Sequence, residues 1–105
     1  MSNYPPVRGI VFDLDGTLDK DPQMWAEFAD IAIERGHNVY LVTCRRNTAE
    51  NREIVAEFCA EYQLNIPSCC RVFTDLGPKR DYMAKLGITI HVWVDDDPAC
   101  IIFGK

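Results

Sequence analysis

Short apolar segments alternate along this chain with longer segments in which apolar residues recur every three or four positions. The short segments are rich in β-branched residues and end in polar residues, which is typical of buried parallel strands. They lie at residues 7–12, 38–42, 70–73 and 88–94. The longer, periodic segments predict three helices, at residues 22–35, 47–62 and 78–86.

Residues typical of helix ends bound these segments. Asp21, followed by a proline, favours a helix start, and Gly36 and Gly87 stand where the first and third helices would end. The second helix begins at either Asn47 or Thr48. The resulting order βαβαβαβ, with short connections, predicts the fold class: α/β, a three-layer Rossmann-like parallel sheet with helices on both faces.

The apolar positions of the helices predict the faces that they bury. In the first helix these are Trp25, Phe28 and Ala32, with Met24 and Ile31 beside them. In the second helix they are Ile54, Val55, Phe58, Cys59 and Tyr62.

Polar side chains follow the predicted strands. Asp13, Thr43 and Asp95 each come directly after an apolar segment. Because the carboxyl ends of parallel strands meet at one edge of a sheet, where ligands bind in open α/β folds, we expect these three side chains to lie close together.

The segment 13–17, Asp-Leu-Asp-Gly-Thr, carries the strongest chemical signal. In an extended backbone Asp13 and Asp15 face the same side, and two close carboxylates repel each other unless a cation lies between them. Oxygen ligands of this kind suit Mg²⁺. Gly16 permits a sharp exit from the strand. A solvated turn is the alternative interpretation, since Asp and Gly are common turn residues.

A second acidic cluster, Asp95, Asp96 and Asp97, follows the last predicted strand. Acidic runs are often solvated surface, but three carboxylates beside a sheet edge destabilise a fold unless a cation or a basic group offsets them. Lys79, at the start of the preceding helix, is a candidate for that group. The sequence leaves open which of Asp96 and Asp97 contacts a metal.

Thr43 is followed by two arginines, which can bind phosphate in a bidentate manner. We expect Arg45, rather than Arg46, to point toward the site. His37 and His91 are expected to be a turn residue and a partly buried strand residue, not catalytic bases.

Composition restricts the classes of function. The formal net charge of −5 argues against a broad nucleic-acid surface, and no apolar run approaches a membrane span. The first nine residues contain no apolar leader segment, and the cysteines are odd in number without a CxxC pair, which disfavours a structural zinc site. We therefore expect free thiols in a cytoplasmic protein that does not bind membranes. A length of 105 residues fits one domain, over residues 1–105.

Taken together, these motifs resemble the haloacid dehalogenase (HAD) superfamily of phosphotransferases. The four matching segments are Asp13-Leu14-Asp15-Gly16-Thr17, Leu41-Val42-Thr43, Lys79 at a helix start, and Val92-Trp93-Val94-Asp95-Asp96. The resemblance covers most of the chain. It implies a Mg²⁺-dependent phosphomonoester hydrolase that works through an aspartyl-phosphate intermediate.

By this resemblance, Asp13 is the nucleophile, and Asp15 is the general acid and base, a role that requires a raised pKa. Thr43 and Lys79 hold the phosphoryl oxygens, with Arg45 as a further candidate. The resemblance implies that Mg²⁺ is held by the Asp13 carboxylate, the Asp15 backbone carbonyl and Asp95, with Asp96 bound directly or through water.

The chain departs from the usual pattern of the family in having no cap domain. The segments on either side of Thr43 have room for no cap domain, so the chain resembles minimal, capless members. Such members often act on large substrates, including nucleic-acid ends, and the Thr43-Cys44-Arg45 segment resembles polynucleotide kinase phosphatase domains. The partner is therefore expected to be a phosphorylated small molecule, nucleotide or nucleic-acid end, although the charge of −5 argues against nucleic acid.

The apolar segment 98–103 is expected to pack on the sheet as a last short strand; the alternative is a patch for homo-oligomer formation. Family members usually continue beyond this segment, so a non-catalytic metal- or phosphate-binding module that has lost turnover is the alternative function. A phosphoacceptor receiver domain is disfavoured, because it carries its acidic pair early and its acceptor aspartate on a later strand.

Overall fold

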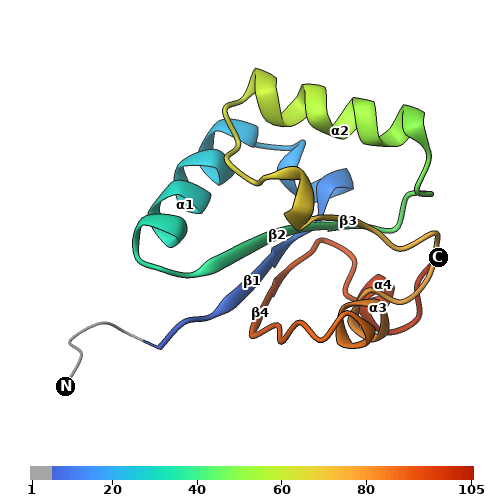
Figure 1. Cartoon of the computed structure of the whole chain (residues 1–105). Helices are drawn as coiled ribbons and strands as arrows, with labels where there is room; N and C mark the ends of the chain where they lie inside the picture. Colours follow the sequence, from blue (N-terminus) through green and yellow to red (C-terminus); the bar gives the residue numbers. More distant parts are fainter. Residues whose placement is uncertain (1–5) are drawn as a thin grey trace.

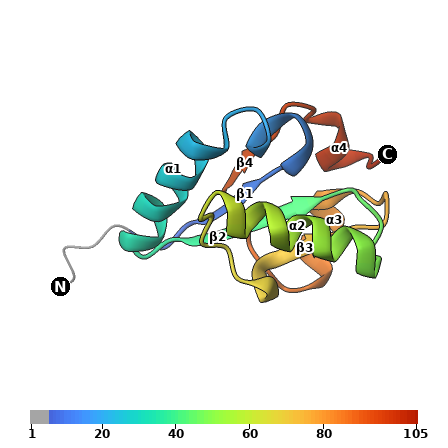
Figure 2. The same cartoon turned by 90° about the horizontal axis from the view of Figure 1, so that it is seen from above.

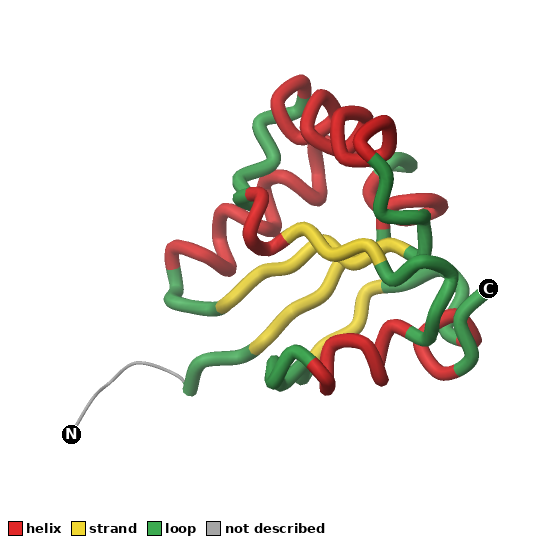
Figure 3. Tube along the Cα trace, turned by 45° about the vertical axis from the view of Figure 1, so that its right-hand side comes forward, coloured by secondary structure: helices red, strands yellow, loops and turns green. Residues whose placement is uncertain are grey.

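The computed structural model describes residues 6–105, so residues 1–5 of the predicted domain lie outside the described part of the chain. Its centre is one all-parallel sheet with the strand order β3-β2-β1-β4 (Figure 1). The strands are β1 (Gly9–Phe12), β2 (Asn38–Thr43), β3 (Arg71–Phe73) and β4 (Val92–Val94). Figure 3 shows the strands side by side with helices around them.

Helices cover both faces of this sheet. Helices α1 (Pro22–Glu34) and α2 (Ala49–Glu61) lie on one face, and α3 (Lys79–Lys85) and α4 (Ala99–Ile102) lie on the other (Figures 1 and 2). This arrangement confirms the predicted α/β class and the three-layer, Rossmann-like parallel sheet.

The helix starts follow the predicted capping signals. The Asp21 side chain accepts a hydrogen bond from the Met24 backbone N–H, and the Thr48 hydroxyl accepts one from Asn51. Thr48, rather than Asn47, is therefore the residue that begins the second helix.

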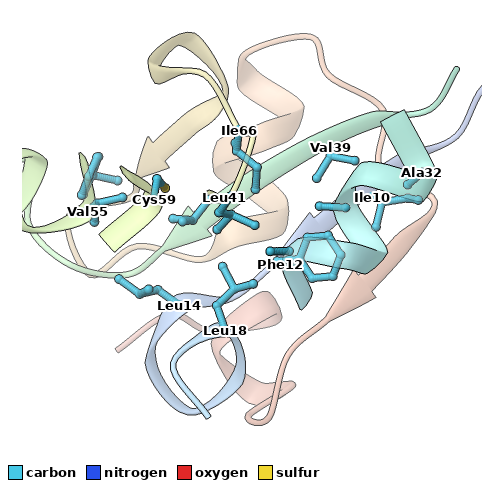
Figure 4. Packing of buried hydrophobic residues seen from close by; sticks show 14 residues of the cluster. Ile10, Phe12, Leu14, Leu18, Ala32, Val39, Leu41, Val55, Cys59 and Ile66 are labelled. Atoms are coloured by element: carbon cyan, nitrogen blue, oxygen red, sulfur yellow. The ribbon is translucent and has the colours of Figure 1, made fainter. Parts of the chain in front are cut away.

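The larger part of the core lies between the sheet and helices α1 and α2 (Figure 4). Phe12 and Leu41, which lie opposite each other on β1 and β2, are completely buried at its centre. A smaller cluster on the other face consists of Val11, Val42, Val72 and Met83. The alternation along β1 and β2 thus supplies both faces of the sheet with core residues.

The expected buried face of α1 is wrong in part. Ala26, Ala29 and Ala32 face the sheet, whereas Met24 and Ile31 are 46% and 58% exposed. Alanine allows the helix backbone to approach the sheet closely, where larger side chains would not fit.

The aromatic residues of α1 pack at the side of the layer between α1 and the sheet. Trp25 and Phe28 pack around Phe12, with ring centroids 5.5 and 5.7 Å from the Phe12 ring. In α2, Val55 and Cys59 are buried as expected, but Ile54 is 40% exposed.

The last strand is shorter than expected. Val92–Val94 pair with β1, and the His91 backbone N–H still donates to the Gly9 carbonyl, whereas Ile88 and Ile90 leave the ladder and pack against the second cluster. As β4 is an edge strand, Val92 is 43% exposed. The first and third strands are also shorter, beginning at Gly9 and Arg71.

The final apolar segment forms the short helix α4, so the expected last strand is wrong. Cys100 is buried where α4 packs beside α3, so the segment packs against the rest of the domain through this helix. Ile102 and Phe103 are 44% and 76% exposed, and self-association through them stays a prediction.

All five cysteines are free, as expected. Cys69 and Cys70 lie in a tight turn before β3 rather than in a strand, and their sulfur atoms are 3.8 Å apart. The Nδ1 atoms of His37 and His91 accept the backbone N–H groups of Arg8 and Gly9, at the amino end of β1. His91 is exposed and precedes the strand, which corrects its expected position.

No helix within residues 6–105 has the length and apolar character needed to cross a bilayer.

The close approach of α1 to the sheet predicts that Ala29→Leu destabilises the protein. Ala29 is completely buried, so the added atoms force α1 away from the sheet, at a cost of about 1–3 kcal/mol. Ala60→Leu, at an exposed position of α2, serves as the matched control and changes stability by less than about 0.5 kcal/mol. Urea denaturation measures both; equal effects would contradict the packing described for α1.

Candidate functional site

A hollow of about 200 Å³ lies at the carboxyl ends of the strands. It brings together side chains from segments that are far apart in the sequence. All seven residues predicted for the site line it: Asp13, Asp15, Thr43, Arg45, Lys79, Asp95 and Asp96. Arg46 is exposed and does not line it, so Arg45 is the arginine that faces the hollow.

Lys79 is the central cation of the hollow. Its side chain is 1% exposed, and its Nζ atom lies 2.6 Å from Asp13 Oδ1 and 2.7 Å from Asp95 Oδ2. Burial by itself lowers the pKa of Lys79, but the two hydrogen bonds to the carboxylates outweigh this and raise the pKa above its ordinary value. Lys79 therefore stays charged and offsets the acidic crowding that the sequence indicates.

Three carboxylates are placed to share one cation. Oxygen atoms of Asp13, Asp95 and Asp96 all lie within 4.8 Å of one another. Asp97 is outside this group: its carboxylate accepts the Cys100 thiol, and its backbone N–H donates to Asp95. Three carboxylates with one ammonium group leave an excess of two negative charges, and the donors are hard oxygen atoms, so this group fits Mg²⁺.

Asp13 is the most perturbed carboxyl group of the hollow. Burial raises its pKa to about 7, and the nearby Asp95 and Asp96 carboxylates act in the same direction. Lys79 opposes this shift through its hydrogen bond and its charge. A bound cation would favour the ionised form of Asp13 still further.

Asp15 has a different environment from the one expected. Arg45 donates two hydrogen bonds to its carboxylate, from Nε at 3.0 Å and from a terminal nitrogen at 2.8 Å. This pairing lowers the pKa of Asp15, although burial acts in the opposite direction. The sequence-based expectation of a raised pKa at Asp15 is therefore wrong, because the arginine paired with it comes from 30 positions away.

Thr17 joins the first and last acidic segments, a role that the sequence analysis missed. Its buried hydroxyl lies 3.5 Å from Asp13 Oδ2 and accepts the backbone N–H of Asp96 at 3.2 Å. Position 16 requires glycine for two reasons. Its φ of +89° is left-handed, and a Cβ atom there would overlap the Asp96 carboxylate. The Gly-Thr pair of the first motif is the signal that could have indicated this packing.

Thr43 is almost completely buried, and its hydroxyl accepts the backbone N–H of Arg45 at 3.2 Å. This bond shapes the loop that aims Arg45 at the hollow. Lys105 also lines the hollow, held by a hydrogen bond from its backbone N–H to Leu76. Nothing in the sequence pattern indicated Lys105, because only the fold brings it near the first motif.

Comparison with known proteins bears on the fold alone. No protein-family profile and no curated protein matches the chain significantly. Among solved structures, it is similar to the crystal structure of the hypothetical protein PH1952 from Pyrococcus horikoshii OT3, with a TM-score of 0.52 and 22% identity. The match covers 75% of this chain but only 30% of that protein. This likeness supports the α/β fold.

The raised pKa of Asp13 predicts how stability depends on pH in buffer without divalent cations. Because its pKa lies near 7 in the folded protein and near 3.8 when unfolded, its stabilising contribution is complete below about pH 4 and is lost as the pH rises through 7. Between pH 5 and pH 8 this loss amounts to about 2–3 kcal/mol, so the melting temperature of Asp13→Asn should rise relative to the original protein by about 10 °C or more.

Asp81→Asn changes the charge equally at an exposed position of α3 and serves as the control. Thermal melts of the three proteins measure the difference. Parallel pH profiles for Asp13→Asn and the original protein would contradict the raised pKa of Asp13.

Proposed function

We propose that this chain is a capless member of the HAD superfamily and a Mg²⁺-dependent phosphomonoester hydrolase. The observation that carries the proposal is the buried arrangement of Asp13, Lys79 and Asp95, in which a lysine ammonium group joins two carboxylates from opposite ends of the chain. Asp96 completes a group of oxygen ligands for the metal. Four motifs in the order of the family support the same assignment.

The residues of the hollow can divide the reaction between them. The Lys79 ammonium group, the Thr43 hydroxyl group and the Arg45 guanidinium group would hold the oxygen atoms of a phosphoryl group in the hollow. An Asp13 carboxylate oxygen then attacks phosphorus, and the bond between phosphorus and the ester oxygen breaks, giving an aspartyl-phosphate. Mg²⁺, held by the Asp13, Asp95 and Asp96 carboxylates and the Asp15 backbone carbonyl, would supply positive charge to the phosphoryl oxygens.

Asp15 would protonate the leaving alcohol and later take a proton from the attacking water. It cannot donate a proton while Arg45 holds it ionised. We therefore propose that Arg45 exchanges the Asp15 carboxylate for a phosphoryl oxygen when substrate binds. This exchange would remove the cause of the lowered pKa and free Asp15 for proton transfer.

The same ion pair supports the alternative function. If Arg45 does not release Asp15, the chain would bind Mg²⁺ and phosphate without turnover, as a non-catalytic module. The two functions differ in whether product is formed, which the following experiments measure.

The first experiment measures phosphate release from para-nitrophenyl phosphate with and without Mg²⁺. The original protein should require Mg²⁺. Asp13→Asn should lose at least about 10³-fold in kcat, since no other residue of the hollow replaces the nucleophile. Asp95→Asn should chiefly raise the Mg²⁺ concentration needed for half-maximal activity, because one of three carboxylate ligands is removed.

Asp97→Asn is the matched control, because its carboxylate lies outside the ligand group. Circular dichroism verifies that the variants are folded. Undiminished turnover by folded Asp13→Asn would exclude the aspartyl-phosphate mechanism.

The second experiment separates the roles of the two aspartates in the first motif. A nitrophenolate leaving group needs no proton, so Asp15→Ala should release about one equivalent of nitrophenolate per protein in a burst, followed by turnover slowed about 10²–10⁴-fold. Asp13→Asn should show no burst. Rapid-mixing absorbance measures both variants, and a steady rate without a burst in Asp15→Ala would argue against Asp15 as the base for the second step.

The substrate would be a phosphorylated molecule whose remainder extends beyond the hollow, because Mg²⁺ and its bound waters would share the volume of about 200 Å³ with the phosphoryl group. A cytoplasmic location, which suits free thiols and a phosphorylated substrate, is part of this proposal.

A further inference from the structure

A second and larger hollow, of about 550 Å³, lies along the outer side of the edge strand β3. Helix α2 forms one wall and helix α3 the other, on opposite sides of β3 (Figure 1). We call it the β3 groove; the residues used below are Asn47, Arg52, Glu53, Arg71, Phe73, Tyr82 and Leu86.

The β3 groove begins where the candidate site ends. Arg45 lines the site and Asn47, two residues later in the same loop, lines the groove. Lys79 and Tyr82 are related in the same way on α3, where residues three apart are neighbours at about 5–6 Å. The site and the groove therefore adjoin along this loop and along α3.

The guanidinium groups of Arg52 and Arg71 and the carboxylate of Glu53 line the groove, so its formal charge is +1 in a chain of net charge −5. Within residues 6–105, no carboxylate forms a salt bridge with Arg52 or Arg71. Arg71 is oriented by a hydrogen bond from Nε to the Ile66 carbonyl at 2.8 Å, and Arg52 donates to the Asn47 side chain at 2.6 Å. Both hydrogen bonds hold the two guanidinium groups at the groove without neutralising them, and the excess of one positive charge over Glu53 favours an anionic ligand there.

The α3 wall and the floor of the groove are aromatic and apolar. Phe73, at the end of β3, is buried in the core with 6% exposure, whereas Tyr82 is partly buried and Leu86 is 52% exposed, so Tyr82 is the aromatic side chain of the groove that a ligand can reach. Flat side chains of this kind stack with nucleobases, and guanidinium groups bind phosphodiesters beside them. A sugar phosphate would leave the aromatic wall without a planar partner.

We propose that the β3 groove binds the nucleotide adjoining the phosphorylated end of a single strand, with its phosphodiester at Arg52 and Arg71 and its base on Tyr82. This inference rests on the proposed function for the identity of the terminal phosphate group. It narrows the proposed substrate to a nucleic-acid end. A chain of net charge −5 can bind such an end if the arginines that contact it lie together in one groove.

The test compares kcat/KM for para-nitrophenyl phosphate with that for short oligonucleotides carrying a 3′ or a 5′ phosphate, in the presence of Mg²⁺. Arg52→Ala should lower the ratio of oligonucleotide to para-nitrophenyl phosphate activity about tenfold, because a charge-assisted hydrogen bond is lost. Tyr82→Leu should lower it by a similar factor through lost stacking. Arg35→Ala, which removes the same charge at an exposed position after α1, should leave the ratio unchanged.

A binding measurement tests the groove without relying on turnover. Fluorescence anisotropy of a labelled, terminally phosphorylated oligonucleotide is measured with Asp13→Asn and with Asp13→Asn plus Arg52→Ala. The second protein should bind about tenfold more weakly, and its dependence of log K on log salt should be shallower by about 0.7.

The outcomes separate the two proposals. Binding that depends on Arg52, in a protein without phosphatase activity, would refute the proposed function and support the groove. Phosphatase activity with equal effects of Arg52→Ala and Arg35→Ala would overturn the groove. A phosphopeptide substrate gives the last comparison. The proposal would also be overturned if Arg52→Ala lowered kcat/KM as much for the phosphopeptide as for the oligonucleotide and Tyr82→Leu had no effect. The groove would then bind anionic peptides.

Discussion

The candidate site depends on one buried ammonium group held between two carboxylates. Lys79 comes from the start of α3, Asp13 from the end of β1 and Asp95 from the end of β4, and all three meet with almost no exposure to water. Removing one partner from such a group leaves a buried charge uncompensated, which typically costs about 3–5 kcal/mol. The same contacts therefore join β1, α3 and β4 at this edge of the sheet and bring together the charges on which the proposed chemistry rests.

The first motif is held in place from both sides of this group. Thr17 bonds to the last acidic segment, and Gly16 allows the Asp96 carboxylate to approach the backbone. Asp15 is turned toward Arg45 instead of the ligand group. One short segment thus presents one aspartate that is buried with a raised pKa and another that is paired with a lowered pKa. This asymmetry suits the proposal that the two aspartates have different roles.

The sheet has two different edges. The β4 edge is a short, partly exposed strand, and at the β3 edge two helices flank a groove that contains two arginines and one glutamate. The proposed chemistry occupies the carboxyl ends of the central strands, and the proposed substrate contacts extend toward β3. The small hollow that is proposed to hold a phosphoryl group therefore lies beside the larger groove that is proposed to hold the rest of the substrate.

The sequence by itself determined the alternation of strands and helices and the sheet edge at which the polar residues meet. It also indicated that Asp13, Lys79 and Asp95 lie together in the hollow at that edge. Strand-end positions and helix caps are local signals, so they can be read from neighbouring residues. The alanine face of α1 and the helical form of α4 depend on how closely elements pack, which periodicity does not show. The pairing of Arg45 with Asp15 and the position of Lys105 also required the tertiary structure, because electrostatic environments arise between residues that are distant in the chain.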